Sequence, residues 1–381
     1  MSEYQYLEFL AIDRPLTAQQ VEELRNISTR AQITPVSFVN EYNWSGLKAS
    51  PVDFMRHYFD LHVFLANWGD AIFMVRLPRE ALEQNILDVF CSSPYLKYEA
   101  LAEHWLITWS LEVSDDYERF EFVEDTAWMS RLAPLREELL RGDLRSLYLG
   151  WLRYISNEDG EPDELEPMVV EGLGQLTAAQ RSLAEFLEID VDLLTGVAKG
   201  QGPKIEQAED ETVVEAWLDS LHKDELRGYL RQMVQGQGAQ AERTVRGKYA
   251  AWQRQVVPAQ VAPRSVAQLW QLAKQAQEIR IVEEAKMLQQ AKAERQQKRN
   301  AWLAQLASDF PQAWKGVHQY ANKGHASAYD TACQQLVDLR DAYNLHDTKA
   351  AFQQQLHEFR IQHQRRRALL QRLDKAGLHS K

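Results

Sequence analysis

The chain has 381 residues, of which 45% are hydrophobic and 26% are charged. This composition is typical of a globular protein and excludes a disordered, collagenous or membrane-spanning chain. The length predicts about two or three domains, with cores large enough to need neither a disulfide nor a metal. The two cysteines, Cys91 and Cys333, are too few and too far apart for a disulfide scaffold or a four-ligand zinc site.

The first residues lack the basic start and the unbroken apolar run of a secretory signal, and no window of 18 apolar residues occurs in the chain. We therefore expect a cytoplasmic protein that does not cross a membrane.

Charge divides the chain into two parts. Residues 1–241 carry 20 Lys and Arg against 43 Asp and Glu, whereas residues 242–381 carry 23 against 12. One interpretation is that the basic helices dock against the acidic body, in this chain or in a second copy. The other is that the basic part meets an external polyanion or an acidic partner.

The densest group of cations lies near the carboxy terminus. Clustered Lys and Arg are what phosphate contact requires, although cations also accumulate at solvated helix ends. The candidate contacts to a polyanion or an acidic partner are Arg360, Arg365, Arg366, Arg367, Arg372 and Lys375.

The amino-terminal part predicts strands separated by helices. Aromatic and β-branched residues and short apolar runs indicate four strands, and spacings of three and four indicate a helix over residues 53–68. The strands are expected at residues 4–12, 33–42, 71–77 and 102–113. These elements predict an α/β sandwich over residues 1–125.

From Trp128 the apolar period is that of a helix, so we expect an α+β protein with a mainly helical remainder. Residues 126–240 form the predicted helical middle domain. They include an acidic segment, 157–167, with six acids in eleven positions, which predicts an exposed or disordered loop. We expect residues 241–310 to form a linker and a long helix, and residues 311–381 to form a basic helical hairpin or small bundle.

The long helix is predicted over residues 265–308, which contain neither Gly nor Pro. Ile281, Ala285 and Leu288 resume an apolar heptad after Arg280 interrupts it, so the pattern does not support a long coiled coil. Residues 289–300 are polar nearly all round, which indicates a helix that crosses solvent or lies against a partner.

No sequence motif for catalysis or nucleotide binding is present. The chain lacks the phosphate-binding GxxxxGK[ST], a GxGxxG after a strand, and the GxSxG nucleophile motif. The histidine pairs His57/His62 and His357/His363 have spacings that do not converge on one metal ion. We therefore expect no cofactor and no bound metal, and the chain reads as a non-enzyme rather than an enzyme.

Two amide–indole pairs end predicted elements: Asn43 with Trp44, and Asn67 with Trp68. They could line a recognition pocket, because indoles offer flat contact area and amides make directional hydrogen bonds. Alternatively, the Asn residues end their secondary-structure elements and the Trp side chains pack in the layer above the sheet.

Several phrases, among them ITPVSFVNEYNW and FLANWGDAIFMVRLP, resemble those of a family of uncharacterised bacterial proteins. The segment from YDTACQQLVDLRDAYN to QRRRALLQRLDKAGL is similar to the helical tail of bacterial SWIM zinc-finger proteins. The SWIM signature needs a CxC pair followed by Cys and His, which Cys91 and Cys333 cannot supply. The resemblance implies a shared helical tail and an association with nucleic-acid-handling systems. Because the signature is missing, no zinc ligand is carried over to this chain.

These observations support three hypotheses. The first is a non-enzymatic interaction or adaptor protein that binds another protein, or a second copy of itself, through its helical carboxy-terminal part. The second is nucleic-acid binding by the basic tail. The third is an enzyme whose site is built from dispersed residues in the amino-terminal part, around Asn43 and Asn67.

Overall fold

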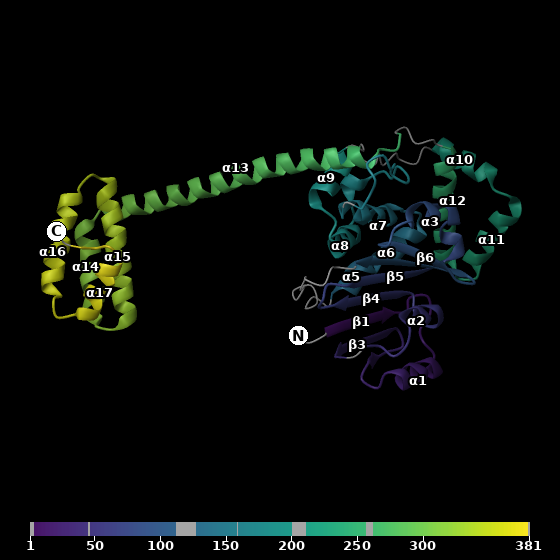
Figure 1. Cartoon of the computed structure of the whole chain (residues 1–381), viewed down its shortest axis with the longest axis horizontal. Helices are drawn as coiled ribbons and strands as arrows, with labels where there is room; N and C mark the ends of the chain where they lie inside the picture. Colours follow the sequence, from purple (N-terminus) through teal and green to yellow (C-terminus); the bar gives the residue numbers. More distant parts are fainter. Residues whose placement is uncertain are drawn as a thin grey trace. The chain divides into compact units, whose positions relative to one another are not determined.

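The computed structural model describes residues 4–44, 46–111, 127–157, 159–199, 211–256 and 262–379. The chain forms two compact units, residues 1–280 and residues 281–381. The first unit contains a β-sheet and helices, and the described residues of the second form helices joined by loops. The predicted α+β class is confirmed (Figure 1).

Among the described residues, one antiparallel sheet of seven strands forms in the order β2-β3-β1-β4-β5-β7-β6. The strands are β1 (Tyr4–Leu10), β2 (Gln32–Ile33), β3 (Ser37–Asn43), β4 (Leu61–Ala66), β5 (Ala71–Pro78), β6 (Leu96–Ala100) and β7 (His104–Leu111). Because neighbouring strands are antiparallel, the start of β1 lies between the end of β3 and the end of β4.

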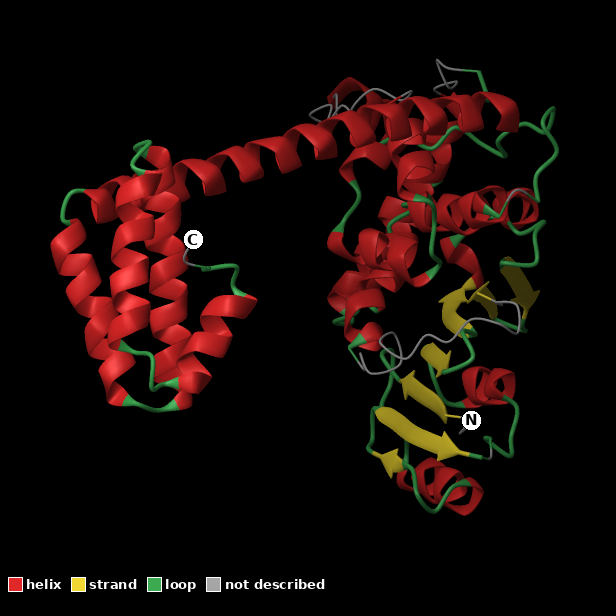
Figure 2. Cartoon of the chain, turned by 60° about the vertical axis from the view of Figure 1, so that its left-hand side comes forward, coloured by secondary structure: helices red, strands yellow, loops and turns green. Residues whose placement is uncertain are grey.

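Side chains of the sheet alternate between two cores, as the pleat of a strand requires. Leu7 and Phe9 of β1 face a core that includes residues of α1 (Ala18–Ile27) and α2 (Pro51–His57). Val63 of β4 faces the other core, which includes residues of the helices that follow β7 in the chain. Figure 2 shows the strands with helices on either side. The sheet is therefore the middle layer of the first unit.

The helix expected over residues 53–68 is wrong beyond its first turns. Helix α2 ends at His57, and β4 begins at Leu61 as a central strand that pairs with β1 on one side and β5 on the other. The spacing of Tyr58, Leu61 and Leu65 fits a helix, but Leu61, Val63 and Leu65 also alternate as a strand requires. Ladder pairing on both sides decides between them, and local sequence cannot show it.

Most of the remaining helices of the first unit share a core with the sheet, and the residues of this core run from Tyr6 to Leu269. One of them, α7 (Arg145–Ser156), lies so close to β6 and β7 that a Cβ on Gly150 would come within 2.9 Å of the Leu96 and Trp109 side chains. The other helices that contribute to this core or pack against it are η1 (Arg79–Ala81), α3 (Gln84–Phe90), α5 (Trp128–Leu132), α6 (Pro134–Leu140), η2 (Leu173–Gln175), α8 (Ala178–Phe186) and α9 (Val191–Lys199). Three further helices precede the long one and contribute no described residue to this core: α10 (Glu211–Ser220), α11 (Lys223–Val234) and α12 (Gly238–Val256).

The described residues of the acidic segment 157–167 form a loop that is only partly exposed. Glu161 and Asp163 are exposed as expected, but Glu166 is 2% exposed. Leu165 forms an isolated antiparallel bridge with Ser265, and the Glu166 N–H donates to the Arg264 carbonyl at 2.8 Å. The loop therefore holds the start of the long helix against the first unit.

The long helix α13 (Val266–Ala307) matches its expected bounds within a residue. It is followed in the second unit by α14 (Phe310–Lys323), α15 (Ala326–Leu345), α16 (Lys349–Gln362) and α17 (Arg367–Lys375). Their apolar faces enclose a separate core that includes Trp314, Leu336, Leu356, Phe359 and Leu369. The part predicted as a helical hairpin or small bundle thus has a core of its own.

Candidate functional site

The strand order brings the two predicted amide–indole pairs to one end of the sheet. Asn43 ends β3 opposite Tyr4, and Asn67 follows β4 on the other side of Tyr4. The Asn67 Oδ1 atom accepts the Tyr4 N–H at 2.9 Å, and the Asn67 N–H donates to the Tyr4 carbonyl at 3.0 Å. Asn67 therefore continues the ladder of β1 beyond the end of β4.

The two indoles differ in their surroundings. The Trp68 Nε1–H donates to Asp70 Oδ2 at 2.8 Å, within the turn between β4 and β5. Trp44 is 67% exposed and has a φ of 67°, in the left-handed region that a bulky residue rarely adopts. Asn67 and Trp68 thus act within the turn, which supports their structural interpretation, while Trp44 is presented to solvent.

The predicted cationic group near the carboxy terminus divides into two sets of three. Arg360 pairs with Asp374 at 2.9 Å, and Arg372 pairs with Asp330 at 2.6 Å. Arg366 donates to the Ala321 carbonyl and to Asn322 Oδ1, at the end of α14. These three arginines bind other parts of the bundle, so their charges are partly used within the second unit.

The other three cations of the group, Arg365, Arg367 and Lys375, are exposed. Within the described part of the chain, no ion pair is formed by any of them. Arg367 begins α17, Arg365 lies two positions before it, and Lys375 ends it. These cations are the ones available to an external acidic group.

Cations of residues 242–280 pair with acids of the first unit. Arg243 pairs with Glu137 at 2.9 Å, Lys248 with Glu225 at 2.7 Å and Arg280 with Asp192 at 2.8 Å. Arg264 pairs with Glu166 at 2.9 Å. The expected attraction between acidic and basic parts of the chain is therefore realised within the first unit.

The pair between Glu166 and Arg264 is buried and shared with a tyrosine. Tyr148 donates to Glu166 Oε2 at 2.7 Å, and the Arg264 Nη1–H donates to the Val197 carbonyl at 3.0 Å. Burial, together with the Glu166 carboxylate, raises the pKa of the Tyr148 hydroxyl well above its usual value. The network centres on one carboxylate and fixes the chain immediately before α13.

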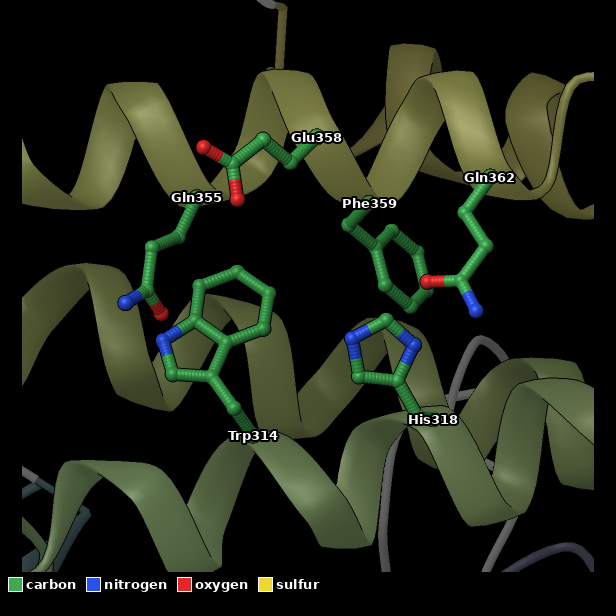
Figure 3. Close-up of a pocket in the computed structure, with 6 residues that line it drawn as sticks. All are labelled: Trp314, His318, Gln355, Glu358, Phe359 and Gln362. Carbon is green, nitrogen blue, oxygen red and sulfur yellow. The ribbon is translucent and has the colours of Figure 1, made fainter.

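A small cavity of about 100 Å³ lies between α14 and α16 in the second unit (Figure 3). Its lining consists of Trp314, His318, Gln355, Glu358, Phe359 and Gln362. The side chains point toward one another from the two helices. The cavity is smaller than sites for drug-sized ligands, which run from about 300 to 1,000 Å³.

His318 of that cavity forms a hydrogen bond with His363, at the end of α16, over 3.2 Å between Nδ1 and Nε2. Burial, with His318 and Arg366 nearby, lowers the pKa of His363 to about 4, and burial also lowers the pKa of His318. Both rings are therefore neutral at pH 7, and one N–H joins them. Sequence spacing missed this pair, because its members are 45 positions apart and no local pattern relates them.

The described residues provide neither a metal-binding group nor a reactive thiol. No group of three or more His, Cys, Asp or Glu side chains among them could hold a metal ion. Cys91 and Cys333 are free, and burial raises the pKa of both thiols, to about 12 for Cys91. Neither thiol is therefore a ready nucleophile at neutral pH.

Comparison of the chain with models of protein families, with curated proteins and with solved structures gives no match. No helix among the described residues has the length and apolar character that a membrane crossing requires.

Proposed function

We propose that the protein is a non-enzymatic adaptor whose carboxy-terminal unit, residues 281–381, binds an acidic protein partner. The observation that carries the proposal is that this unit has a core of its own, while its first residues, 281–298, are all exposed. A separate core next to an exposed helix is what a binding module requires, because such a module folds without help from the first unit.

Charge supports an acidic partner. The second unit holds 16 Lys and Arg against 10 Asp and Glu, whereas residues 1–280 hold 27 against 45. Arg365, Arg367 and Lys375 are exposed cations without a described ion pair, so a carboxylate on a partner can reach them without breaking an existing contact.

Nucleic acid is the second class of partner to test. Binding to phosphates needs several clustered cations that release counterions together. Half of the predicted group already binds within the bundle, and the remaining three lie at opposite ends of α17. This division favours a protein partner over a phosphate backbone.

The test captures partners of the full chain from host lysate and maps contacts by cross-linking mass spectrometry. We expect cross-links within residues 281–381 that are lost when Arg365, Arg367 and Lys375 are together replaced by Glu. The matched control replaces the exposed cations Arg14, Lys48 and Lys97 of the first unit by Glu, which makes the same change in net charge.

Cross-links confined to residues 1–280, or equal capture by the two triple variants, would overturn the proposal. Capture that disappears after nuclease treatment would replace it with nucleic-acid binding. In that case affinity for a defined duplex should fall steeply with salt.

A further inference from the structure

Residues 281–298 of α13 carry apolar side chains that no other described residue of the second unit covers. Residues 281–298 are all exposed, and Ile281 and Leu288 are 54% and 57% exposed. A helix that merely crosses solvent gains nothing from large apolar side chains, whereas a helix that meets a partner does.

Ile281 and Leu288 belong to one face of the helix, whereas the exposed Ile279, Val282 and Met287 lie outside it. Six residues follow one another at alternating spacings of three and four, which places them in a single stripe. We call this set the α13 stripe, and it consists of Glu278, Ile281, Ala285, Leu288, Lys292 and Arg295. The stripe is acidic at its start, apolar in its middle and basic at its end.

The charges of the stripe are exposed, and within the described part of the chain none of Glu278, Lys292 and Arg295 forms an ion pair. Other cations of the same helix do form pairs. Arg280 binds Asp192 at 2.8 Å, and Arg299 binds Asp338 at 2.6 Å. Arg280 lies off the stripe, whereas Arg299 is the next position of the same face, four residues after Arg295. The second unit therefore uses this face from Arg299 onward, and the charges from Glu278 to Arg295 remain available.

We propose that the α13 stripe pairs with the same stripe of a second copy of this chain, with the two helices antiparallel. In that arrangement Ala285 of one copy lies opposite Leu288 of the other, and Glu278 lies opposite Arg295. Ile281 then packs against the aliphatic stem of Lys292. A parallel pair would instead place Glu278 against Glu278 and Arg295 against Arg295, so charge selects the antiparallel orientation.

The association is weak and reversible. The stripe from Glu278 to Arg295 spans about 26 Å at about 1.5 Å per residue. A contact between two helices of this length falls in the class of small interfaces below about 1,200 Å². We expect a monomer–dimer equilibrium with a dissociation constant on the order of 10 µM.

Sedimentation equilibrium of the full chain, from about 1 to about 200 µM, measures this equilibrium. We expect Leu288→Lys to weaken dimerisation at least about tenfold, because it places a cation in the apolar middle of both stripes. The matched control is Met287→Lys, which adds the same charge one position away. Met287 is 68% exposed and lies about 100° around the helix from Leu288, so its substitution should leave dimerisation unchanged.

Charge exchange tests the orientation. Glu278→Lys alone should weaken the dimer, because two cations then face each other at each end. The double variant Glu278→Lys/Arg295→Glu restores opposite charges in the antiparallel pair and should recover the affinity. A wild-type chain that stays monomeric at every concentration, equal effects of Leu288→Lys and Met287→Lys, or no recovery in the double variant would overturn the proposal. The adaptor function is tested separately, because its variants at Arg365, Arg367 and Lys375 leave the stripe intact.

Discussion

The Glu166 carboxylate receives two hydrogen bonds from the Arg264 guanidinium, 98 positions later in the chain, with Nε and Nη2 each 2.9 Å from a carboxylate oxygen. The Arg264 backbone N–H donates to the same carboxylate at 2.9 Å. The pair therefore joins a loop of the first unit to the chain just before α13. With both side chains largely buried, each charge depends on the other for its solvation.

Glu166→Gln should lower the free energy of unfolding by about 3–5 kcal/mol, because it leaves the Arg264 guanidinium buried without its carboxylate. Urea denaturation of the two proteins measures the difference. Glu242→Gln is the control, since Glu242 pairs with Arg246 on the surface of α12. That change should cost less than about 1 kcal/mol. Equal losses in the two variants would contradict the role of burial.

Gly196 of α9 lies against the backbone of α13 at Leu272. A Cβ at this position would lie 2.5 Å from the Leu272 carbonyl carbon, so Gly196→Ala forces the two helices apart. We expect a loss of about 1–3 kcal/mol and a lower melting temperature. Gly228→Ala in α11 is the matched control, because no atom lies within 4 Å of its added methyl group. It should stabilise the helix by about 0.5–1 kcal/mol. A Gly196→Ala protein as stable as wild type would show that α13 is not held here.

His62 makes the first unit sensitive to acid. Its ring stacks on Phe9 with 3.9 Å between ring centroids, and burial lowers its pKa to about 3. The unfolded chain binds a proton at this residue below about pH 6.5, whereas the folded chain does not. The contribution of His62 is therefore complete above pH 6.5 and declines as the pH falls toward 3, by about 2 kcal/mol at pH 5.

His62→Phe removes this proton, so the first unit of the variant should lose less stability between pH 7 and pH 5 than wild type. Thermal unfolding over that pH range measures the two slopes. Identical slopes would mean that another group dominates the acid response.

Truncation of Trp44 and truncation of Asn67 should change the stability of the protein in opposite directions. The backbone of Trp44 is in the left-handed region, which glycine adopts without strain, and its indole is exposed. Trp44→Gly should therefore raise the free energy of unfolding by up to about 1 kcal/mol. Asn67→Ala removes the acceptor of the Tyr4 N–H and should cost about 1–3 kcal/mol. Chemical denaturation of both variants measures whether the free energy of unfolding rises for Trp44→Gly and falls for Asn67→Ala. A large loss on Trp44→Gly would show that the indole packs against something in solution.

Much of the fold could be predicted where the pattern is local and long. Helix α13 was predicted within a residue of its bounds, because its residues are good helix formers without Gly or Pro. Strand β4 was missed, because its apolar spacing fits both a helix and a strand. The exposure predicted for Glu166 was wrong, because its cation lies in a distant segment.

The candidate sites show the same limit. Sequence located the cationic group near the carboxy terminus, but it could not separate Arg366, which binds the end of α14, from the adjacent Arg365 and Arg367. Nor could it relate His318 to His363.

The sequence by itself determined the division into a sheet-containing part and a helical part, the long helix and the uneven distribution of charge, because periodicity and composition act over neighbouring residues. Only the tertiary structure decided which charges are paired and which remain available, and which apolar side chains are covered. Those outcomes depend on residues that are far apart in the chain and meet only when the cores form.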